Sequence, residues 1–82
     1  MDFNQILMEV TEIFKKILRN KNIVLDANTT AKDVEAWDSL SHIQLMVAIE
    51  KHFNIVFSST ELIKKKNVGE LISVIEQKLK NK

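Results

Sequence analysis

The sequence predicts an all-α fold, a small four-helix bundle with three main helices and one short helix. Two observations concern composition: 45% of the 82 residues are hydrophobic, and the chain contains no proline and one glycine. A chain of many short strands would need more of these turn-forming residues. The third observation is that three segments repeat apolar residues at the three-and-four spacing of an amphipathic helix. The length suffices for one core but not for two, so residues 1–82 are predicted to form a single domain.

The first predicted helix spans about residues 3–20. Asp2 and Gln5 have the spacing of a capping box at its start. Arg19 and Lys21 lie near its end, where the helix dipole favours positive charge. The apolar residues of this segment form one continuous stripe: Phe3, Ile6, Leu7, Val10, Ile13, Phe14, Ile17 and Leu18.

Residues 22–37 are predicted to form a long loop. No helical period is sustained there, and Asn, Asp and Thr are frequent, whose side chains compete for backbone hydrogen bonds. A loop of this length in a small domain is usually functional or held against the core. Four apolar side chains are available to hold it: Ile23, Leu25, Val34 and Trp37. Trp37, the only tryptophan, is therefore expected to be a packing anchor rather than a ligand-binding ring.

The second predicted helix spans about residues 39–53 and is unusually apolar. Its apolar residues cover a broader arc than one stripe against a core requires: Leu40, Ile43, Leu45, Met46, Val47, Ala48, Ile49 and Phe53. Such a surplus means that a helix is central to the core or that it presents an exposed apolar surface to a partner. We expect both from this helix, with the surplus face as a candidate docking surface.

A short helix is predicted over about residues 59–65, because Ser58 and Glu61 have capping-box spacing. It is expected to fray at residues 64–66, which are three lysines. The preceding run, residues 54–57, is too short to found a sheet. It is predicted to be a loop that turns Ile55 or Phe57 toward the core.

The last predicted helix spans about residues 68–80. Asn67 and Glu70 have the spacing of an N-terminal cap at its start. Its apolar residues again fall on one face: Val68, Leu71, Ile72, Ile75 and Leu79. The four helices together account for the predicted bundle.

Composition and charge argue against several classes of partner. The net charge of +1 provides no overall field for nucleic acid or an anionic membrane, and few aromatic residues are available for base stacking. The clustered lysines are therefore interpreted as solvated helix faces and termini. The absence of cysteine means no disulfide framework and no thiolate zinc site, as is common in the cytoplasm, which is the expected location. No apolar run is long enough for a membrane span, so membrane insertion is not expected.

Residues for enzyme chemistry are nearly absent, and neither a catalytic nor a metal-binding residue is predicted. His42 and His52 lie about 80 degrees apart around a helix, which is poor geometry for a shared metal, and both are expected at the surface. His42 follows Ser39 by three residues, but a pair on a helix surface without a cleft is a weak nucleophile and base. A single glycine also excludes a glycine-rich phosphate loop.

Ser39 is the residue with the clearest chemical potential. It lies at the entrance to the second predicted helix, where unpaired N–H groups and the helix dipole favour an attached anion. The hydroxyl would also be accessible to another enzyme at the end of the long loop. On position alone, a simpler alternative is that Ser39 or Asp38 merely caps the helix.

The residues around Ser39 resemble the acyl carrier proteins. The central motif of the resemblance is the tripeptide Asp38-Ser39-Leu40, and the similarity extends from about Val34 to Leu79. After the tripeptide it rests on Ile43, Leu45, Ala48, Ile49, Glu50, Phe53 and Ile55, and on Asn67-Val68-Gly69-Glu70-Leu71 at the start of the last helix. The resemblance implies the four-helix bundle of that family.

The resemblance also implies a function. Ser39 would receive a 4'-phosphopantetheine arm from coenzyme A, with Asp38 and Leu40 beside it in the cofactor-binding motif. The thiol of the arm would carry acyl or aminoacyl groups as thioesters. Leu40, Ile43, Gln44 and Val47 would form the face that partner enzymes recognise. The implied partners are a phosphopantetheinyl transferase, which itself needs Mg²⁺, and enzymes that load or transfer acyl groups; the carrier would be a monomer and not an enzyme.

One departure from the family concerns charge. Ser41, Gln44 and Lys51 stand where acidic residues are common in general fatty-acid carriers. This departure implies a specialised carrier for a lipid, polyketide-like or peptide-like pathway. The alternative from a different class is an unmodified helical module that binds a protein partner through the same helix face.

Overall fold

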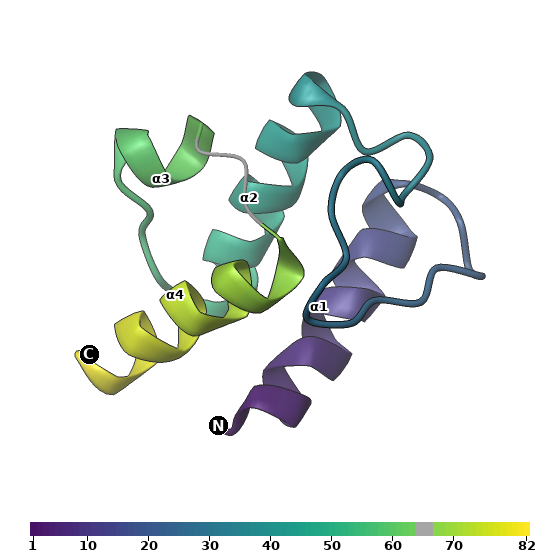
Figure 1. The fold of residues 1–82 in the computed structure, drawn as a ribbon. Helices are drawn as coiled ribbons and strands as arrows, with labels where there is room; N and C mark the ends of the chain where they lie inside the picture. The colour runs from purple at the N-terminus through teal and green to yellow at the C-terminus, as the bar shows by residue number, and fades with distance from the viewer. Residues whose placement is uncertain (64–66) are drawn as a thin grey trace.

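The computed structural model describes residues 1–63 and 67–82, and this part of the chain is all-α (Figure 1). Its helices are α1 (Phe3–Ile17), α2 (Ser39–Phe53), α3 (Ser59–Ile63) and α4 (Val68–Lys80). α1 packs against both α2 and α4, and the short α3 packs against α2. The predicted all-α four-helix bundle is confirmed.

α1 ends earlier than the sequence predicts. Asp2 caps its start by accepting a hydrogen bond from the Gln5 N–H at 2.8 Å, but the Gln5 side chain donates to Glu9 instead of completing a capping box. At the other end the helix stops at Ile17, before the predicted boundary near residue 20. Arg19 adopts a left-handed conformation with φ 54°, which lets the following N–H bond back to the Lys15 carbonyl at 3.0 Å. This geometry closes a helix without glycine, so composition did not reveal it.

The long loop between α1 and α2 is held against the bundle, as predicted. Its four apolar side chains are all buried: Ile23, Leu25, Val34 and Trp37. Two backbone hydrogen bonds tie the loop to the start of α4, from Val68 to Thr29 at 2.8 Å and from Gly69 to Ala27 at 2.9 Å. A Cβ atom at Gly69 would lie 2.9 Å from the Ala27 carbonyl oxygen. The close approach of the two backbones therefore requires glycine at this position.

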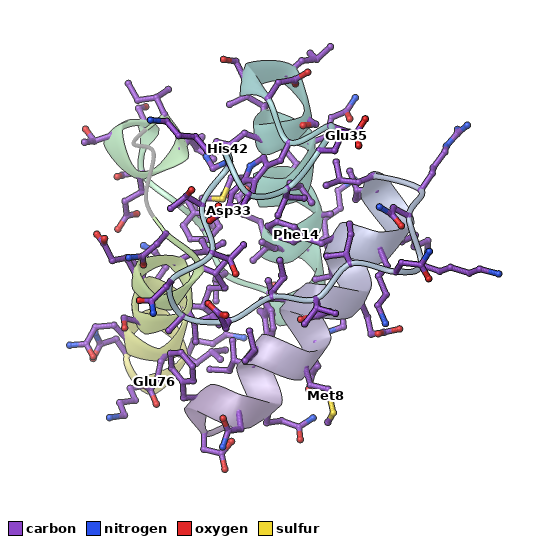
Figure 2. All side chains as sticks on the ribbon, turned by 45° about the vertical axis from the view of Figure 1, so that its right-hand side comes forward. Met8, Phe14, Asp33, Glu35, His42 and Glu76 are labelled. Carbon is purple, nitrogen blue, oxygen red and sulfur yellow. The ribbon has the colours of Figure 1, made fainter. Side chains whose placement is uncertain are left out.

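The core is formed where α1, α2 and α4 meet. Eight side chains there are almost completely buried: Ile6, Val10, Phe14, Leu45, Ile49, Val68, Ile72 and Ile75. Trp37 extends this core into the loop, because its ring packs edge-on against Phe14 with centroids 4.9 Å apart. The prediction that Trp37 is a packing anchor is confirmed. Figure 2 shows the contrast between Phe14, which is directed into the bundle, and Met8, which points away from it.

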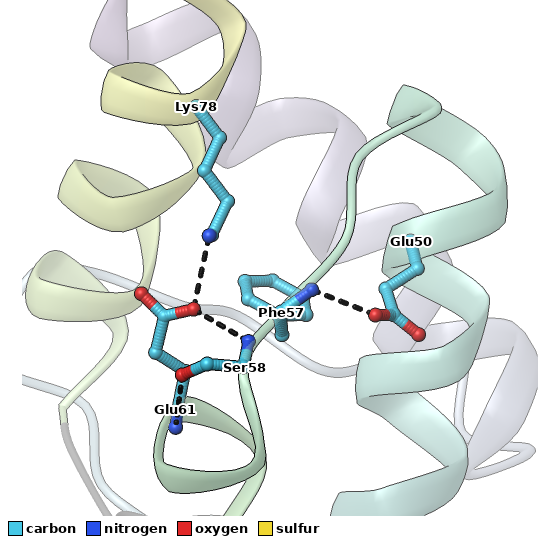
Figure 3. A network of polar contacts seen from close by, with 5 residues as sticks. All are labelled: Glu50, Phe57, Ser58, Glu61 and Lys78. Carbon is cyan, nitrogen blue, oxygen red and sulfur yellow. Dashed lines mark hydrogen bonds and ion pairs between the residues drawn. The ribbon is translucent and has the colours of Figure 1, made fainter. Parts of the chain in front are cut away.

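The segment between α2 and α3 turns both of its candidate side chains inward. Ile55 and Phe57 are buried, as the sequence predicted for one of the two. Asn54 ends α2 in a left-handed conformation with φ 57°. The Glu50 carboxylate then accepts a hydrogen bond from the Phe57 N–H at 2.8 Å, which holds the segment against α2 (Figure 3).

α3 is fixed by its own cap and by α4. Ser58 and Glu61 form the predicted capping box: the Glu61 carboxylate accepts from the Ser58 N–H at 2.8 Å, and Ser58 Oγ accepts from the Glu61 N–H at 3.2 Å. Lys78 on α4 lies 2.9 Å from the same carboxylate (Figure 3). The Ser58 N–H and then Lys78 lower the pKa of Glu61 below its usual value. The predicted continuation to residue 65 and the expected fraying lie outside the described residues.

Candidate functional site

Asp38, rather than Ser39, caps α2. The Asp38 carboxylate accepts a hydrogen bond from the Ser41 N–H at 2.9 Å, and Ser41 Oγ accepts one from the Asp38 N–H at 2.9 Å. The Ser41 hydroxyl also donates to the Ala36 carbonyl at 2.6 Å. These reciprocal bonds form a capping box that fixes the angle at which the loop enters the helix. Hydrogen bonding to the Ser41 N–H is the main reason that the pKa of Asp38 lies below its usual value.

Ser39 is the first residue of α2, and its side chain is exposed. Among the described residues, no partner forms a hydrogen bond with its hydroxyl. The capping alternative therefore applies to Asp38 and not to Ser39. A negative group attached to Ser39 would share the positive end of the helix with the Asp38 carboxylate. The Ser39 hydroxyl itself is accessible and has no structural task in the described part of the chain.

His42 is half-buried, so the prediction of a surface position is wrong for this histidine. Trp37 Nε1, which can only donate, lies 3.1 Å from His42 Nδ1, so Nδ1 accepts this hydrogen bond. The two rings are stacked with centroids 6.1 Å apart. His42 therefore faces the interior between α2 and the loop, as Figure 2 shows, and is not paired with the Ser39 hydroxyl. The sequence did not reveal the contact between Trp37 and His42, because this contact depends on how the loop folds back.

His52 is exposed, as predicted, and lies at the other end of α2. Its Nε2 atom is 2.7 Å from the Glu9 carboxylate on α1. Hydrogen bonds from Gln5 and then His52 lower the pKa of Glu9 below its usual value. The described residues contain no cluster of three or more His, Cys, Asp or Glu side chains that could hold a metal ion. The His52–Glu9 pair links α2 to α1, and both residues are distant in sequence from Ser39.

A groove of about 730 Å³ opens beside Ser39. Its walls come from the long loop, α2, α3 and the start of α4, and they include Lys32, His42, Ile43, Leu62 and Asn67. The groove thus begins at the exposed hydroxyl and combines polar with apolar side chains. An arm attached to Ser39 has space to fold back into it.

The apolar surplus of α2 divides between core and surface. Leu45, Met46, Ile49 and Phe53 are buried in the bundle. Leu40, Ile43 and Val47 remain 74%, 41% and 40% exposed. Together with the exposed Gln44 they form what we term the α2 face: Leu40, Ile43, Gln44 and Val47. The sequence prediction of an exposed apolar surface on this helix is confirmed, and the α2 face lies directly after Ser39.

Comparison with known proteins identifies the family. A model of the family described as "Phosphopantetheine attachment site" matches residues 9–75. The acyl carrier protein of Cyanidium caldarium is 36% identical over 80 residues, which cover 95% of this chain and 91% of that protein. This chain belongs to the acyl carrier protein family. The solution structure of the holo acyl carrier protein from Geobacter metallireducens is similar to this carrier with a TM-score of 0.83 and 44% identity, over 92% of this chain and 86% of that one.

Membership of the family establishes the type of function. This carrier protein holds acyl groups on a covalently attached 4'-phosphopantetheine and is not itself an enzyme. It interacts with a phosphopantetheinyl transferase and with enzymes of a biosynthetic pathway. The alternative of an unmodified interaction module does not account for these matches. None of the helices in the described ranges is long and apolar enough to cross a membrane.

Proposed function

We propose that Ser39 is the residue of this carrier that receives the 4'-phosphopantetheine arm. The observation that carries the proposal is the division of tasks at the start of α2. Asp38 and Ser41 form the capping box, which leaves the Ser39 hydroxyl exposed and unbonded among the described residues. The tripeptide Asp38-Ser39-Leu40, which the resemblance singled out, lies within the matched range 9–75.

The side chains around Ser39 suit the attachment. Asp38 keeps the first turn of α2 in place and so fixes the position of the neighbouring hydroxyl. Leu40, 74% exposed, offers an apolar contact to the enzyme that attaches the arm. When bound, the arm supplies a terminal thiol to which acyl groups are joined as thioesters. The groove beside Ser39 gives that arm a partly sheltered path along the protein.

Intact-mass measurement after coexpression with a broad-specificity phosphopantetheinyl transferase tests this proposal. The protein should gain the mass of one 4'-phosphopantetheine group, and Ser39→Ala should abolish the gain. Ser59→Ala is the matched control, because Ser59 is likewise an exposed serine at the first position of a helix. The control should be modified as completely as the wild type. A gain that persists in Ser39→Ala would place the arm elsewhere.

We further propose that the α2 face is the surface that partner enzymes recognise. It is apolar, exposed and adjacent to Ser39. Its helix contains a single acidic residue, Glu50, whose carboxylate is bonded to the Phe57 N–H. This distribution supports docking by apolar contact and a dedicated lipid, polyketide-like or peptide-like pathway rather than general fatty-acid synthesis. A monomeric state and a cytoplasmic location remain predictions.

A further inference from the structure

We infer that Lys32 binds the phosphodiester of the 4'-phosphopantetheine arm and thereby directs the arm into the groove beside Ser39. The inference rests on the proposed attachment at Ser39. Lys32 belongs to the wall that the long loop contributes to this groove, whereas Ser39 belongs to the wall from α2. The loop would therefore give the arm a contact that is separate from its point of attachment.

The charges that line the groove favour such a contact. Asp38 and Glu70 bring two carboxylates to its walls, and Lys32 is the only lysine or arginine in its described lining. The phosphodiester of an arm on Ser39 would add a further negative charge next to Asp38. Repulsion between like charges raises the free energy of this arrangement unless a cation lies nearby. Lys32 is the groove residue that can supply this cation.

The cap of α2 prevents Asp38 from relieving the repulsion. Its carboxylate accepts the Ser41 N–H at 2.9 Å, and this bond lowers the pKa of Asp38, so the group stays ionised at neutral pH. The same bond occupies one of the N–H groups at the positive end of α2 that would otherwise favour a phosphate. An arm on Ser39 therefore benefits from a positive group outside the helix.

The backbone that carries Lys32 is held in place, although it belongs to a long loop. Thr30 and Asp33 bond to each other around it: the Thr30 N–H donates to the Asp33 carboxylate at 3.0 Å, and the Asp33 N–H donates to the Thr30 carbonyl at 2.9 Å. The adjacent Thr29 carbonyl accepts the Val68 N–H at 2.8 Å, which ties this turn to α4. Lys32 therefore projects from a fixed point of the groove wall.

The ammonium group of Lys32 is available to an anion. Lys32 is exposed and forms no ion pair with another described residue. The neighbouring Asp33 carboxylate is engaged by the N–H and the hydroxyl of Thr30 instead. Lysine carries a compact charge on a flexible stem and binds a phosphate as a point charge. Its chemistry therefore matches the phosphodiester.

The other walls of the groove suit the rest of the arm. The lining is mainly apolar and includes Ile43 and Leu62, which can contact the methyl and methylene groups of the arm. Thr30 and Asn67 add hydrogen-bonding groups for its amides. A contact between Lys32 and the phosphodiester would orient the start of the arm along this lining rather than toward solvent.

The sequence allows the position of the arm to be measured directly. The chain contains no cysteine, so the thiol of the arm is the only thiol of the holo protein. Trp37, the only tryptophan, lines the groove. A nitroxide joined to the thiol quenches the fluorescence of Trp37 when the arm lies in the groove. Reduction of the nitroxide by ascorbate gives the unquenched reference in the same sample.

Three variants test the role of the positive charge. We expect Lys32→Met to raise the ratio of solvent-exposed to groove-bound arm about 3-fold, the scale of one exposed ion pair. Lys32→Arg keeps the charge and should behave as the wild type does. Lys21→Met is the matched control and should also match the wild type, since Lys21 is an exposed lysine of the same loop that does not line the groove. Salt at about 0.5 M should bring the wild type close to Lys32→Met by screening.

A second measurement needs no label. The phosphorus NMR resonance of the holo protein should shift between wild type and Lys32→Met and stay unchanged in Lys21→Met. The unmodified forms of all variants should have the same circular dichroism and Trp37 emission, which separates an effect on the arm from an effect on the fold.

Equal quenching in wild type and Lys32→Met, or no quenching in the wild type, would overturn the inference. An unmoved phosphorus resonance in Lys32→Met, or an equal loss of quenching in Lys21→Met, would overturn it as well. A failure of Ser39 to gain the mass of the arm would instead overturn the proposed attachment site. Intact mass, measured first, separates these two failures.

Discussion

At the scale of single residues, neighbouring side chains at the start of α2 perform different tasks. Asp38 stabilises the helix end through Ser41, and this frees the hydroxyl of Ser39. The sequence left open which of Asp38 and Ser39 caps the helix, because both side chains are suited to this role. The sequence analysis did not recognise Ser41 as part of the cap, although its position three residues after Asp38 is the capping-box spacing.

The pH dependence of stability should report the Asp38 cap. Because the folded state lowers the pKa of Asp38, the ionised carboxylate contributes stability above its ordinary pKa of 3.8, and this contribution is lost as the pH falls through the lower folded value. The difference in unfolding free energy between wild type and Asp38→Asn should therefore be constant near neutral pH and shrink below the ordinary pKa. Urea denaturation across this range measures it.

Comparison with Asp38→Asn separates the pH-dependent contribution of Asp38 to stability from the contributions of two other carboxyl groups. Glu9 and Glu61 also have lowered pKa values, so acid weakens their contributions in the same direction. These groups are unchanged in Asp38→Asn and cancel in the difference. A difference that grows as the pH falls would contradict the assignment of the cap to the ionised form.

At the scale of elements, α2 contributes side chains both to the core and to an exposed apolar face. Its buried side chains, Leu45, Met46, Ile49 and Phe53, build the core, whereas the α2 face is exposed. The breadth of the apolar arc predicted this division from the sequence. The end of α1 was predicted less well, because the left-handed Arg19 that closes it has no glycine to signal it.

Loss of one apolar side chain from the α2 face should impair recognition without unfolding the protein. Ile43→Asp is expected to lower kcat/KM for arm attachment by more than about 10-fold, since central apolar contacts dominate such interfaces. Val56→Asp is the control, because Val56 is 78% exposed and follows α2 on a different segment. The control should retain the wild-type rate, and circular dichroism should show both variants folded.

The same assay distinguishes apolar from electrostatic docking. We expect kcat/KM to change by less than about 3-fold between about 50 and 300 mM salt, because screening weakens contacts between charges and leaves apolar contacts intact. A steep loss of rate with salt would show that charged groups outside the α2 face control recognition.

At the scale of the whole molecule, the bundle is completed by a loop rather than by a further long helix. Trp37 joins the loop to the core, and the backbone bonds from Val68 and Gly69 join the loop to α4. The same closure brings Lys32 and His42 into one groove with Ser39. The candidate site therefore depends on contacts between segments that are far apart along the chain.

Gly69→Ala should test this closure. The added Cβ would lie 2.9 Å from the Ala27 carbonyl oxygen, so one of the two backbones must shift. Overpacking of this kind costs about 1–3 kcal/mol, which exceeds the gain in helix propensity of at most about 1 kcal/mol. We expect a net loss of unfolding free energy in urea. Ser73→Ala, an exposed position on the same helix, is the control, and equal stability of Gly69→Ala and wild type would show that the loop is not closely packed there.

The sequence by itself determined the four helices, the caps at the starts of α3 and α4, the apolar faces and the residues around Ser39. These features depend on local spacing, on side chains that bond to nearby backbone, and on motif residues that are contiguous in the chain. Only the tertiary structure decided that Asp38 rather than Ser39 caps α2, that His42 faces inward against Trp37, and that a groove opens beside Ser39. The cap depends on the precise backbone conformation at residues 36–41, and the other two features depend on how a long loop without helical period folds back onto the bundle.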